Sequence, residues 1–248
     1  MRLSSDDTIT AIILCYWEER LGYVSKIIDT LRNNTLPPTN IVVFNNNPDL
    51  KGVSFEHAVT ISSGENFYCF ARHVASLLYN TKYYYFQDDD LVVDNLELLR
   101  VFSDVLMKHP ESVVSIQGRD IIRSANGEIE FAKTDERETN EDILETDIAF
   151  GRLHMCAKGP ILRMLGIRHQ YGIYSNRGDD IALSLSNKIY GFNNYIVKTV
   201  GRERDFKVSN GLWKGKGHTQ ARKAVATLFL DIMNAKESIN ASEATGPL

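Results

Sequence analysis

Near the end of its first third the chain reads Tyr83-Tyr84-Tyr85-Phe86-Gln87-Asp88-Asp89-Asp90. Consecutive aromatic residues at 83–86 are typical of a buried β-strand, and the acidic run follows at the carboxyl end of that strand. Neighbouring carboxylates repel one another, so a bound cation is the natural reason to keep them together. In an extended segment Asp88 and Asp90 point to the same side, which suits Mn²⁺ or Mg²⁺. A solvated turn with a capping acid is the alternative.

The segments around this stretch alternate between strand and helix patterns. Short apolar runs predict strands at residues 8–16, 41–44, 59–61 and 113–116, and helical periodicity predicts helices at 18–33 and 95–108. A further helix is expected between the third and fourth strands, with an apolar face made of Phe67, Phe70, Val74, Leu77 and Leu78. This alternation predicts an α/β fold with a mostly parallel central sheet and helices on both faces. Such sheets bind ligands at the carboxyl ends of their strands.

The second half of the chain is less regular. It predicts hairpin-like pieces at 119–133 and helices near 159–166, 179–190 and 218–234. Neither an internal repeat nor a low-complexity linker interrupts the sequence, so a single domain over residues 1–235 is expected. Residues 236–248 are expected to form a flexible tail.

Composition excludes several classes of protein. Of the 248 residues 43% are hydrophobic and 24% charged, and the net charge is -4, so the chain is neither disordered nor fibrous and does not coat nucleic acid. No apolar run approaches the roughly 20 residues that span a bilayer, and residues 1–10 lack the apolar core of a signal peptide. Cys15, Cys69 and Cys156 fit neither a disulfide framework nor a zinc spacing. We therefore expect no membrane partner and a protein of a reducing compartment, the cytoplasm.

Charge is unevenly distributed along the chain. Residues 133–147 carry seven acidic side chains against two basic ones, whereas residues 198–223 carry eight basic side chains against two acidic ones. A basic patch on an acidic protein indicates an anionic ligand, with a solvated surface as the alternative. Within that patch residues 211–217 form a glycine-rich basic segment around Trp213, which is suited to close over a ligand.

A second acidic pair, Asp179-Asp180, opens a predicted helix. We interpret it as a carboxylate held rigidly at the helix start and pointing into a cleft; the alternative is acids that only balance the helix dipole. His218 and Arg222 are one turn apart on the inward face of the last helix. Inward cationic groups need partners, and a bound diphosphate with its metal would supply them; an ion pair with a local acid is the alternative.

Polar side chains follow the strand ends of the first half. They are Arg20, Asn45, Asn46, Asn66 and Arg72. An asparagine offers both a donor and an acceptor, as the edge of a pyrimidine requires, and Arg72 is placed to reach a phosphate.

Taken in order, these pieces resemble the catalytic domain of the exostosin family of metal-dependent GT-A glycosyltransferases. The similarity runs from about residue 10 to residue 235. The matching pieces are a first strand followed by Arg20, the strand 41–44 with Asn45-Asn46, Asn66, Arg72, Asp88-Asp89-Asp90, Gly118-Arg119, Gly151, Gly178-Asp179-Asp180-Ile181-Ala182, and Gly211-Leu212 leading to His218 and Arg222. Their common order is more specific than any single piece.

The resemblance implies a Rossmann-like GT-A fold, with a nucleotide-sugar-binding half at 1–117 and an acceptor-binding half at 118–235. It implies retaining transfer of a hexose or N-acetylhexosamine from a UDP-sugar donor, with Mn²⁺ or Mg²⁺ as cofactor. Asp180 and Asp179 would face the donor sugar and acceptor, and Arg222 would stabilise the leaving diphosphate. The implied metal ligands are Asp90, Asp88 and His218, and the residues implied to hold the nucleotide sugar are Arg20, Asn45, Asn66, Arg72, Asp88 and Asp89.

Three features depart from the family pattern. Arg177 stands where an asparagine usually precedes the second acidic motif, so contacts with the acceptor or donor sugar differ. Gly178 and Val225 stand where the family has cysteines, which fits a reducing compartment. The membrane anchor of the animal Golgi members is missing, so their heparan-type acceptor is not implied.

The acceptor stays open. A 5-hydroxymethylpyrimidine base in DNA is one option, because the basic segment and Trp213 suit a phosphate backbone and a flipped base. Small GT-A enzymes of viruses and phages act on such bases, and by this likeness the chain would belong to the cytoplasm of a bacterial, phage-infected or viral host cell. A glycan, a lipid-linked sugar or a protein is another option. Two further functions remain: a nucleotidyltransferase of the same fold, disfavoured because its usual glycine-rich signature is missing after the first strand, and a catalytically silent binding protein, disfavoured because both acidic motifs and Arg222 are present.

Overall fold

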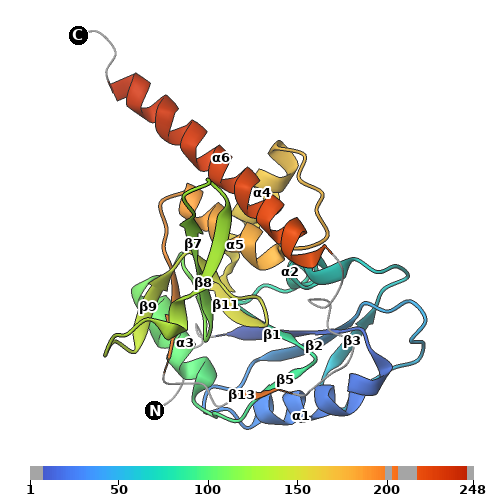
Figure 1. Cartoon of the computed structure of the whole chain (residues 1–248). Coiled ribbons are helices and arrows are strands. Elements are labelled where there is room, and N and C mark those ends of the chain that lie inside the picture. The colour runs from blue at the N-terminus through green and yellow to red at the C-terminus, as the bar shows by residue number, and fades with distance from the viewer. Residues whose placement is uncertain (1–7, 199–202, 206–216, 245–248) are drawn as a thin grey trace.

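The computed structural model describes residues 8–198, 203–205 and 217–244. Its centre is an eight-stranded sheet (Figure 1). The strands lie in the order β3 (Val59–Ser62), β2 (Asn40–Asn45), β1 (Ile9–Cys15), β4 (Tyr83–Asp88), β11 (Leu153–Ala157), β6 (Val113–Ser115), β12 (Asn194–Val197) and β9 (Ile143–Thr146). The five strands predicted in the first half of the chain are confirmed.

The sheet is mixed but largely parallel. β1 pairs in parallel with β2 and β4, β2 with β3, and β6 with β12. β11 runs antiparallel to β4 and β6, and β9 antiparallel to β12. The mostly parallel sheet is confirmed in this coarse form, but β11 comes from the second half of the chain and separates β4 from β6. The alternation of strands and helices could not predict this insertion, because long-range packing sets which strands are neighbours.

Helices cover both faces of the sheet, as expected. One buried cluster joins β1, through Ile9, Ala11 and Ile13, to α1 (Leu21–Arg32) and α3 (Leu98–Lys108). The other contains Ile12 of β1 and joins α4 (Lys158–Gln170), α5 (Asp179–Ile189) and α6 (His218–Ala244). Side chains that alternate along β1 therefore enter opposite cores.

Two small sheets flank the central one. β7 (Gly118–Arg123) and β8 (Ile129–Lys133) form an antiparallel hairpin that β10 (Ile148–Ala149) extends, so the hairpin expected at 119–133 is confirmed. β13 (Glu203–Asp205) pairs antiparallel with β5 (Leu91–Val93) directly after the acidic run. Short 3-10 helices are η1 (Glu18–Arg20), η2 (Tyr68–Phe70) and η3 (Thr134–Glu136).

The apolar helix face expected at 67–78 is wrong. The helix there is short, η2 followed by α2 (Ala71–Ser76), and Arg72, His73 and Ser76 are its buried polar side chains. Of the five apolar residues expected inside only Phe70 is buried, while Phe67, Val74, Leu77 and Leu78 are exposed. The helix is turned so that Arg72 enters the protein, where it pairs with Asp88 and Asp179. An unpaired guanidinium would be costly to bury, so these two partners allow this orientation.

The last helix is longer than predicted. α6 continues beyond residue 234 to Ala244 and projects from the body of the molecule in Figure 1. The expected tail 236–248 is thus helical over 236–244. Neither glycine nor proline interrupts residues 236–244, so the sequence there contains no strong helix breaker. Within the described ranges no helix has the length and apolar character needed to cross a membrane.

Candidate functional site

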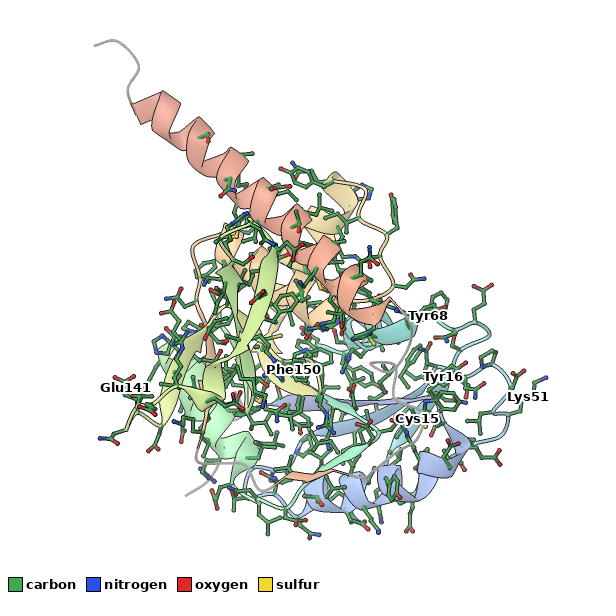
Figure 2. The ribbon with its side chains drawn as sticks, in the orientation of Figure 1. Cys15, Tyr16, Lys51, Tyr68, Glu141 and Phe150 are labelled. Carbon is green, nitrogen blue, oxygen red and sulfur yellow. The ribbon has the colours of Figure 1, made fainter. Side chains whose placement is uncertain are left out.

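The acidic run lies at the carboxyl ends of β1 and β4, where a sheet of this kind binds ligands. Asp88 is the last residue of β4, and Asp89 and Asp90 form the turn into β5. β1 ends beside it, and Tyr16, labelled in Figure 2, follows that strand. The parallel pairing of β1 with β4 brings these two strand ends together.

Asp89 points into the protein. Its carboxylate accepts a hydrogen bond of 2.6 Å from Nη1 of Arg20 and one of 3.0 Å from the backbone N–H of Tyr16. Burial raises the pKa of this carboxyl, although Arg20 and the Tyr16 N–H oppose the rise. Arg20 and Asp89 are both buried, and their ion pair ties the segment after β1 to the end of β4. Arg20 and Asp89 were expected at the nucleotide sugar. In the described structure they bind each other.

Asp88 and Asp90 are more open than Asp89. Asp88 accepts a 2.7 Å hydrogen bond from Nη1 of Arg72, and its side chain is 31% exposed. Burial raises the pKa of Asp88 to about 7; Arg72 opposes this and the charge of Asp90 adds to it. Among the described residues Asp90 has longer contacts, 3.4 Å to Arg20 and 3.5 Å to Arg152. These two carboxylates are the ones that a cation can reach.

The second acidic motif begins α5, as predicted. Gly178 precedes it with φ +77°, a left-handed conformation that glycine adopts without strain. Asp179 and Asp180 are both buried. Arg222 donates to both oxygens of Asp180 at 2.8 Å, and the N–H of Gly151 donates to Oδ2 at 3.2 Å. Burial alone would raise the pKa of Asp180, but the charge and hydrogen bonds of Arg222 outweigh it and lower this pKa.

Arg72 joins the two acidic motifs. Its Nη1 binds Asp88 at 2.7 Å and its Nε lies 3.1 Å from Oδ2 of Asp179. Nη1 also donates to the carbonyl oxygen of Gly151 at 2.9 Å, and Nε to that of Cys69 at 3.2 Å. Burial by itself would lower the pKa of Arg72. The charges of Asp179 and Asp88 raise this pKa by more than burial lowers it, so the guanidinium stays charged. The arginine expected to reach a phosphate is instead 2% exposed and occupied by protein partners.

The segment Phe150–Arg152 connects the motifs on their other side. Gly151 binds Asp180 through its N–H and Arg72 through its carbonyl. The carbonyl of Arg152 accepts a 2.8 Å hydrogen bond from the N–H of Asp88. A Cβ on Gly151 would lie 2.8 Å from Cβ of Asp180, so no larger residue fits without a shift. The sequence offered only a matching glycine here, because backbone hydrogen bonds leave no side-chain signature.

An aromatic ring lies beside the second motif. The guanidinium carbon of Arg222 is 5.6 Å from the ring centroid of Phe150, and that of Arg119 is 4.7 Å from it. Phe150 is labelled near the centre of Figure 2. It was not among the residues predicted for the site, since an isolated phenylalanine in an irregular segment has no distinguishing pattern.

His218 and Arg222 share the inward face of α6 with Val225 and Phe229, which are buried, as predicted. His218 has a buried Nδ1 with no hydrogen-bond partner among the described residues. Burial, then the charges of Arg222 and Arg177, lower the pKa of His218, so its imidazole is neutral at neutral pH. The charge of Asp180 opposes this decrease in the pKa of His218.

The expected metal ligands are Asp88, Asp90 and His218. Within the described ranges no group of three His, Cys, Asp or Glu side chains is placed to hold a metal ion, so Asp88, Asp90 and His218 do not form a ready three-ligand set. Asp88 and Asp90 do fit Mn²⁺ or Mg²⁺ in another way. Such ions bind through one or two carboxylates and take their remaining ligands from phosphates and water. The donor set fits a cation that binds together with a diphosphate.

Asn45, the last residue of β2, and Asn46, which follows it, hold the loops at this strand end. Asn45 is buried, donates to the carbonyl of Leu50 at 2.6 Å and accepts from the N–H of Asn47 at 3.1 Å. Asn46 donates to Oδ1 of Asn66 at 2.9 Å and to the carbonyl of Tyr68 at 3.0 Å. The polar groups expected to meet a nucleobase thus hold the strand-end loops in the described structure.

Other expected features fall partly outside the described residues. Of the basic segment 211–217 only Gly217 is described, so Trp213 and most of the patch at 198–223 lie outside. Cys15, Cys69 and Cys156 are free cysteines, in agreement with the absence of a disulfide pattern.

Comparison of the chain with protein-family models found no match, and comparison with curated proteins found none either.

Proposed function

We propose that this chain is a metal-dependent GT-A glycosyltransferase that moves a hexose or N-acetylhexosamine from a UDP-sugar to an acceptor hydroxyl with retention of configuration. One observation carries the proposal. Two acidic motifs that lie far apart in the sequence meet at the carboxyl end of β4, where Asp88 and Asp179 contact the same guanidinium at 2.7 and 3.1 Å. This is the edge of the sheet at which α/β proteins bind nucleotides.

Burial of the acids argues against the purely structural alternatives. A solvated turn would leave Asp89 in water, and acids that only balance a helix dipole would lie at the surface. Instead Asp89, Asp179 and Asp180 are all less than 5% exposed. Burying ion pairs rarely stabilises a fold relative to apolar side chains of similar size, so their concentration here supports a functional reason.

A second observation supports the exostosin resemblance in particular. Gly178 and Val225 are the positions at which the family pattern has cysteines. A Cβ built on Gly178 lies 3.5 Å from Cβ of Val225. That separation falls in the range of disulfide-bonded cysteines. Both departures from the family pattern therefore lie at one contact, between the residue that precedes α5 and a residue of α6.

In this proposal Asp90 and Asp88 hold the divalent cation. The cation supplies positive charge for the diphosphate that departs from the sugar. Arg20 and Arg72 fix the turn that carries these ligands, since each binds one of the neighbouring carboxylates. A turn held in this way places its charges before the donor arrives, which is the arrangement that favours the transition state.

Asp179 and Asp180 act on the sugar side. Glycosyl transfer passes through a transition state with positive charge on the sugar ring. A buried, ionised carboxylate nearby stabilises that charge. Arg222 and Gly151 hold Asp180 in place, and Arg222 lowers the pKa of Asp180, so that it stays ionised. Contact of Arg222 with the leaving diphosphate is a further role that the resemblance implies.

A donor and acceptor screen tests the proposal. Wild-type protein with Mn²⁺ is incubated with UDP-, GDP- and ADP-sugars and with three acceptors: DNA containing 5-hydroxymethylpyrimidine, an oligosaccharide and a lipid-linked sugar. Mass spectrometry should detect a hexosyl or N-acetylhexosaminyl addition and free UDP with one acceptor. Asp90→Asn should abolish this addition. Glu141→Gln should not, because Glu141 is an exposed acid at the left edge of the molecule in Figure 2.

Other products would replace the proposal. Release of pyrophosphate from a nucleoside triphosphate and a sugar phosphate would identify a nucleotidyltransferase. Tight binding of UDP-sugar without hydrolysis or transfer to any acceptor would identify a binding protein.

A further inference from the structure

Two histidines face each other in the core behind Asp179. His73 on α2 and His154 on β11 are completely buried, and their Nε2 atoms are 3.2 Å apart. The ring of Phe86 lies 4.8 Å from one imidazole and 4.9 Å from the other, between centroids. Nδ1 of His73 is 3.9 Å from Oδ2 of Asp179. The proposed chemistry above uses neither imidazole.

Both imidazoles are neutral. Burial lowers the pKa of His73 and of His154 well below the ordinary value of 6.5, and the charge of Arg72 lowers both further. A neutral imidazole carries one N–H and one bare nitrogen. The contact between the two Nε2 atoms therefore requires one ring to donate and the other to accept, which leaves two arrangements.

Asp179 distinguishes these arrangements. If His73 donated through Nε2, its bare Nδ1 lone pair would face a carboxylate oxygen 3.9 Å away, and the two would repel each other. If His154 donates, His73 accepts at Nε2 and carries its proton on Nδ1, 3.9 Å from Oδ2 of Asp179. The second arrangement is electrostatically favourable in a buried environment, where such interactions are strong.

We infer that His154 donates to His73 and that His73 holds its Nδ1–H toward Asp179, so that both histidines are positioning residues for that carboxylate. At 3.9 Å this N–H acts as an oriented dipole beside Oδ2, whose other close neighbour is Nε of Arg72 at 3.1 Å. Nδ1 of His154 has no hydrogen-bond partner among the residues that the structure describes. In this arrangement the pair places an N–H dipole beside the charge of Asp179.

The assignment of the two tautomers is independent of the proposed function. The positioning role of the two histidines rests on the proposed function. Nitrogen-15 NMR of imidazole-labelled protein without ligands tests the assignment, because protonated and bare ring nitrogens have widely separated shifts. We expect His73 as the Nδ1–H tautomer and His154 as the Nε2–H tautomer. Asp179→Ala should weaken the preference of His73 for Nδ1–H, and Glu141→Gln, which changes an exposed acid outside the site, should preserve it. An Nε2–H tautomer of His73 in the wild type would overturn the inference.

Kinetics test the positioning role. His154→Leu removes the donor to His73, whereas His154→Gln keeps an N–H in reach. We expect His154→Leu to lower kcat about tenfold with little change in KM for the donor, as loss of an outer hydrogen bond does around functional groups, and His154→Gln to recover part of it. Apo melting temperatures of both variants separate this from misfolding. Wild-type kcat in folded His154→Leu would overturn the role. Absence of transfer by the wild type with every donor would contradict the proposed function and leave the tautomer result standing.

Discussion

The guanidinium of Arg222 holds the carboxylate of Asp180 through two hydrogen bonds of 2.8 Å each. The resemblance places the carboxylate of Asp180 at the donor sugar and the guanidinium of Arg222 at the leaving diphosphate. In the structure these two groups of opposite charge bind each other. The Asp180 side chain is 2% exposed and that of Arg222 14%. A fork of this geometry fixes the carboxylate in position as well as in charge.

Arg222→Ala should therefore affect both folding and catalysis. We expect the free energy of unfolding of the apo protein to fall by about 2 kcal/mol, somewhat less than for a fully buried pair because Arg222 is partly exposed. We expect kcat to fall by roughly 10²- to 10³-fold. Arg222→Lys should be intermediate, since lysine keeps the charge without the planar fork.

A double-mutant cycle with Asp180→Ala measures the pair directly. Chemical unfolding of the wild type, the two single variants and the double variant gives the coupling energy. A coupling near zero would contradict the ion pair, and an apo stability unchanged by Arg222→Ala would return this arginine to a purely catalytic role.

Gly151→Ala should disturb the same pair from the other side. Its new Cβ would meet Cβ of Asp180 at 2.8 Å, so the carboxylate or the backbone must move. We expect a loss of about 1–3 kcal/mol in stability, typical of overpacking, together with a large loss of transfer. Gly166→Ala is the matched control: it lies within α4 with nothing within 4 Å of its Cβ position, so it should stabilise by about 0.5–1 kcal/mol. Equal melting temperatures for the two variants would contradict the close contact at Gly151.

Asp88 should make the apo protein less stable as pH rises toward neutrality. Its pKa is raised from 3.8 to about 7, mainly by burial, so the folded state binds a proton that the unfolded state has lost over that window. Stability from this group is present below about pH 4 and is lost as pH rises to about 7. His73, His154 and Asp180 have lowered pKa values and so give the opposite slope.

Asp88→Asn isolates the contribution of Asp88, because the other groups are common to both proteins. The melting temperature of the variant relative to the wild type should increase from about pH 4 to about pH 7 in metal-free buffer. A difference that does not depend on pH would show that the Asp88 carboxyl titrates normally.

Asp90→Ala should abolish transfer and leave the apo fold intact. In the part of the chain that the structure describes, Asp90 makes longer contacts, 3.4 Å to Arg20 and 3.5 Å to Arg152, and its charge opposes ionisation of Asp88. Its removal therefore relieves repulsion, and the apo melting temperature should stay the same or rise. The stabilisation of wild-type protein by Mn²⁺ with UDP should vanish in the variant, as measured by thermal shift. Full transfer activity of the wild type in excess EDTA would refute metal dependence.

Local patterns predicted most of the elements. Apolar runs located the five strands of the first half, and α5 and α6 begin at Asp179 and His218 as expected. Patterns of this kind work because strand and helix periods are properties of neighbouring residues. α2 is the counterexample: its apolar residues lie outward, since the partners of Arg72 come from β4 and α5, far along the chain.

The site shows the same division between local and distant information. Residue types and order alone determined which acids and arginines to consider, because chemistry resides in side chains: Asp88, Asp89, Asp90, Asp179, Asp180, Arg20, Arg72, His218 and Arg222. Only the tertiary structure decided which of them meet. Arg72 pairs with both acidic motifs, Arg222 with Asp180, and His73 with His154. Asn45, at the end of β2, bonds the loop that follows it. Ion pairs between residues far apart in the chain depend on where the sheet brings strand ends together, and no local pattern contains that geometry.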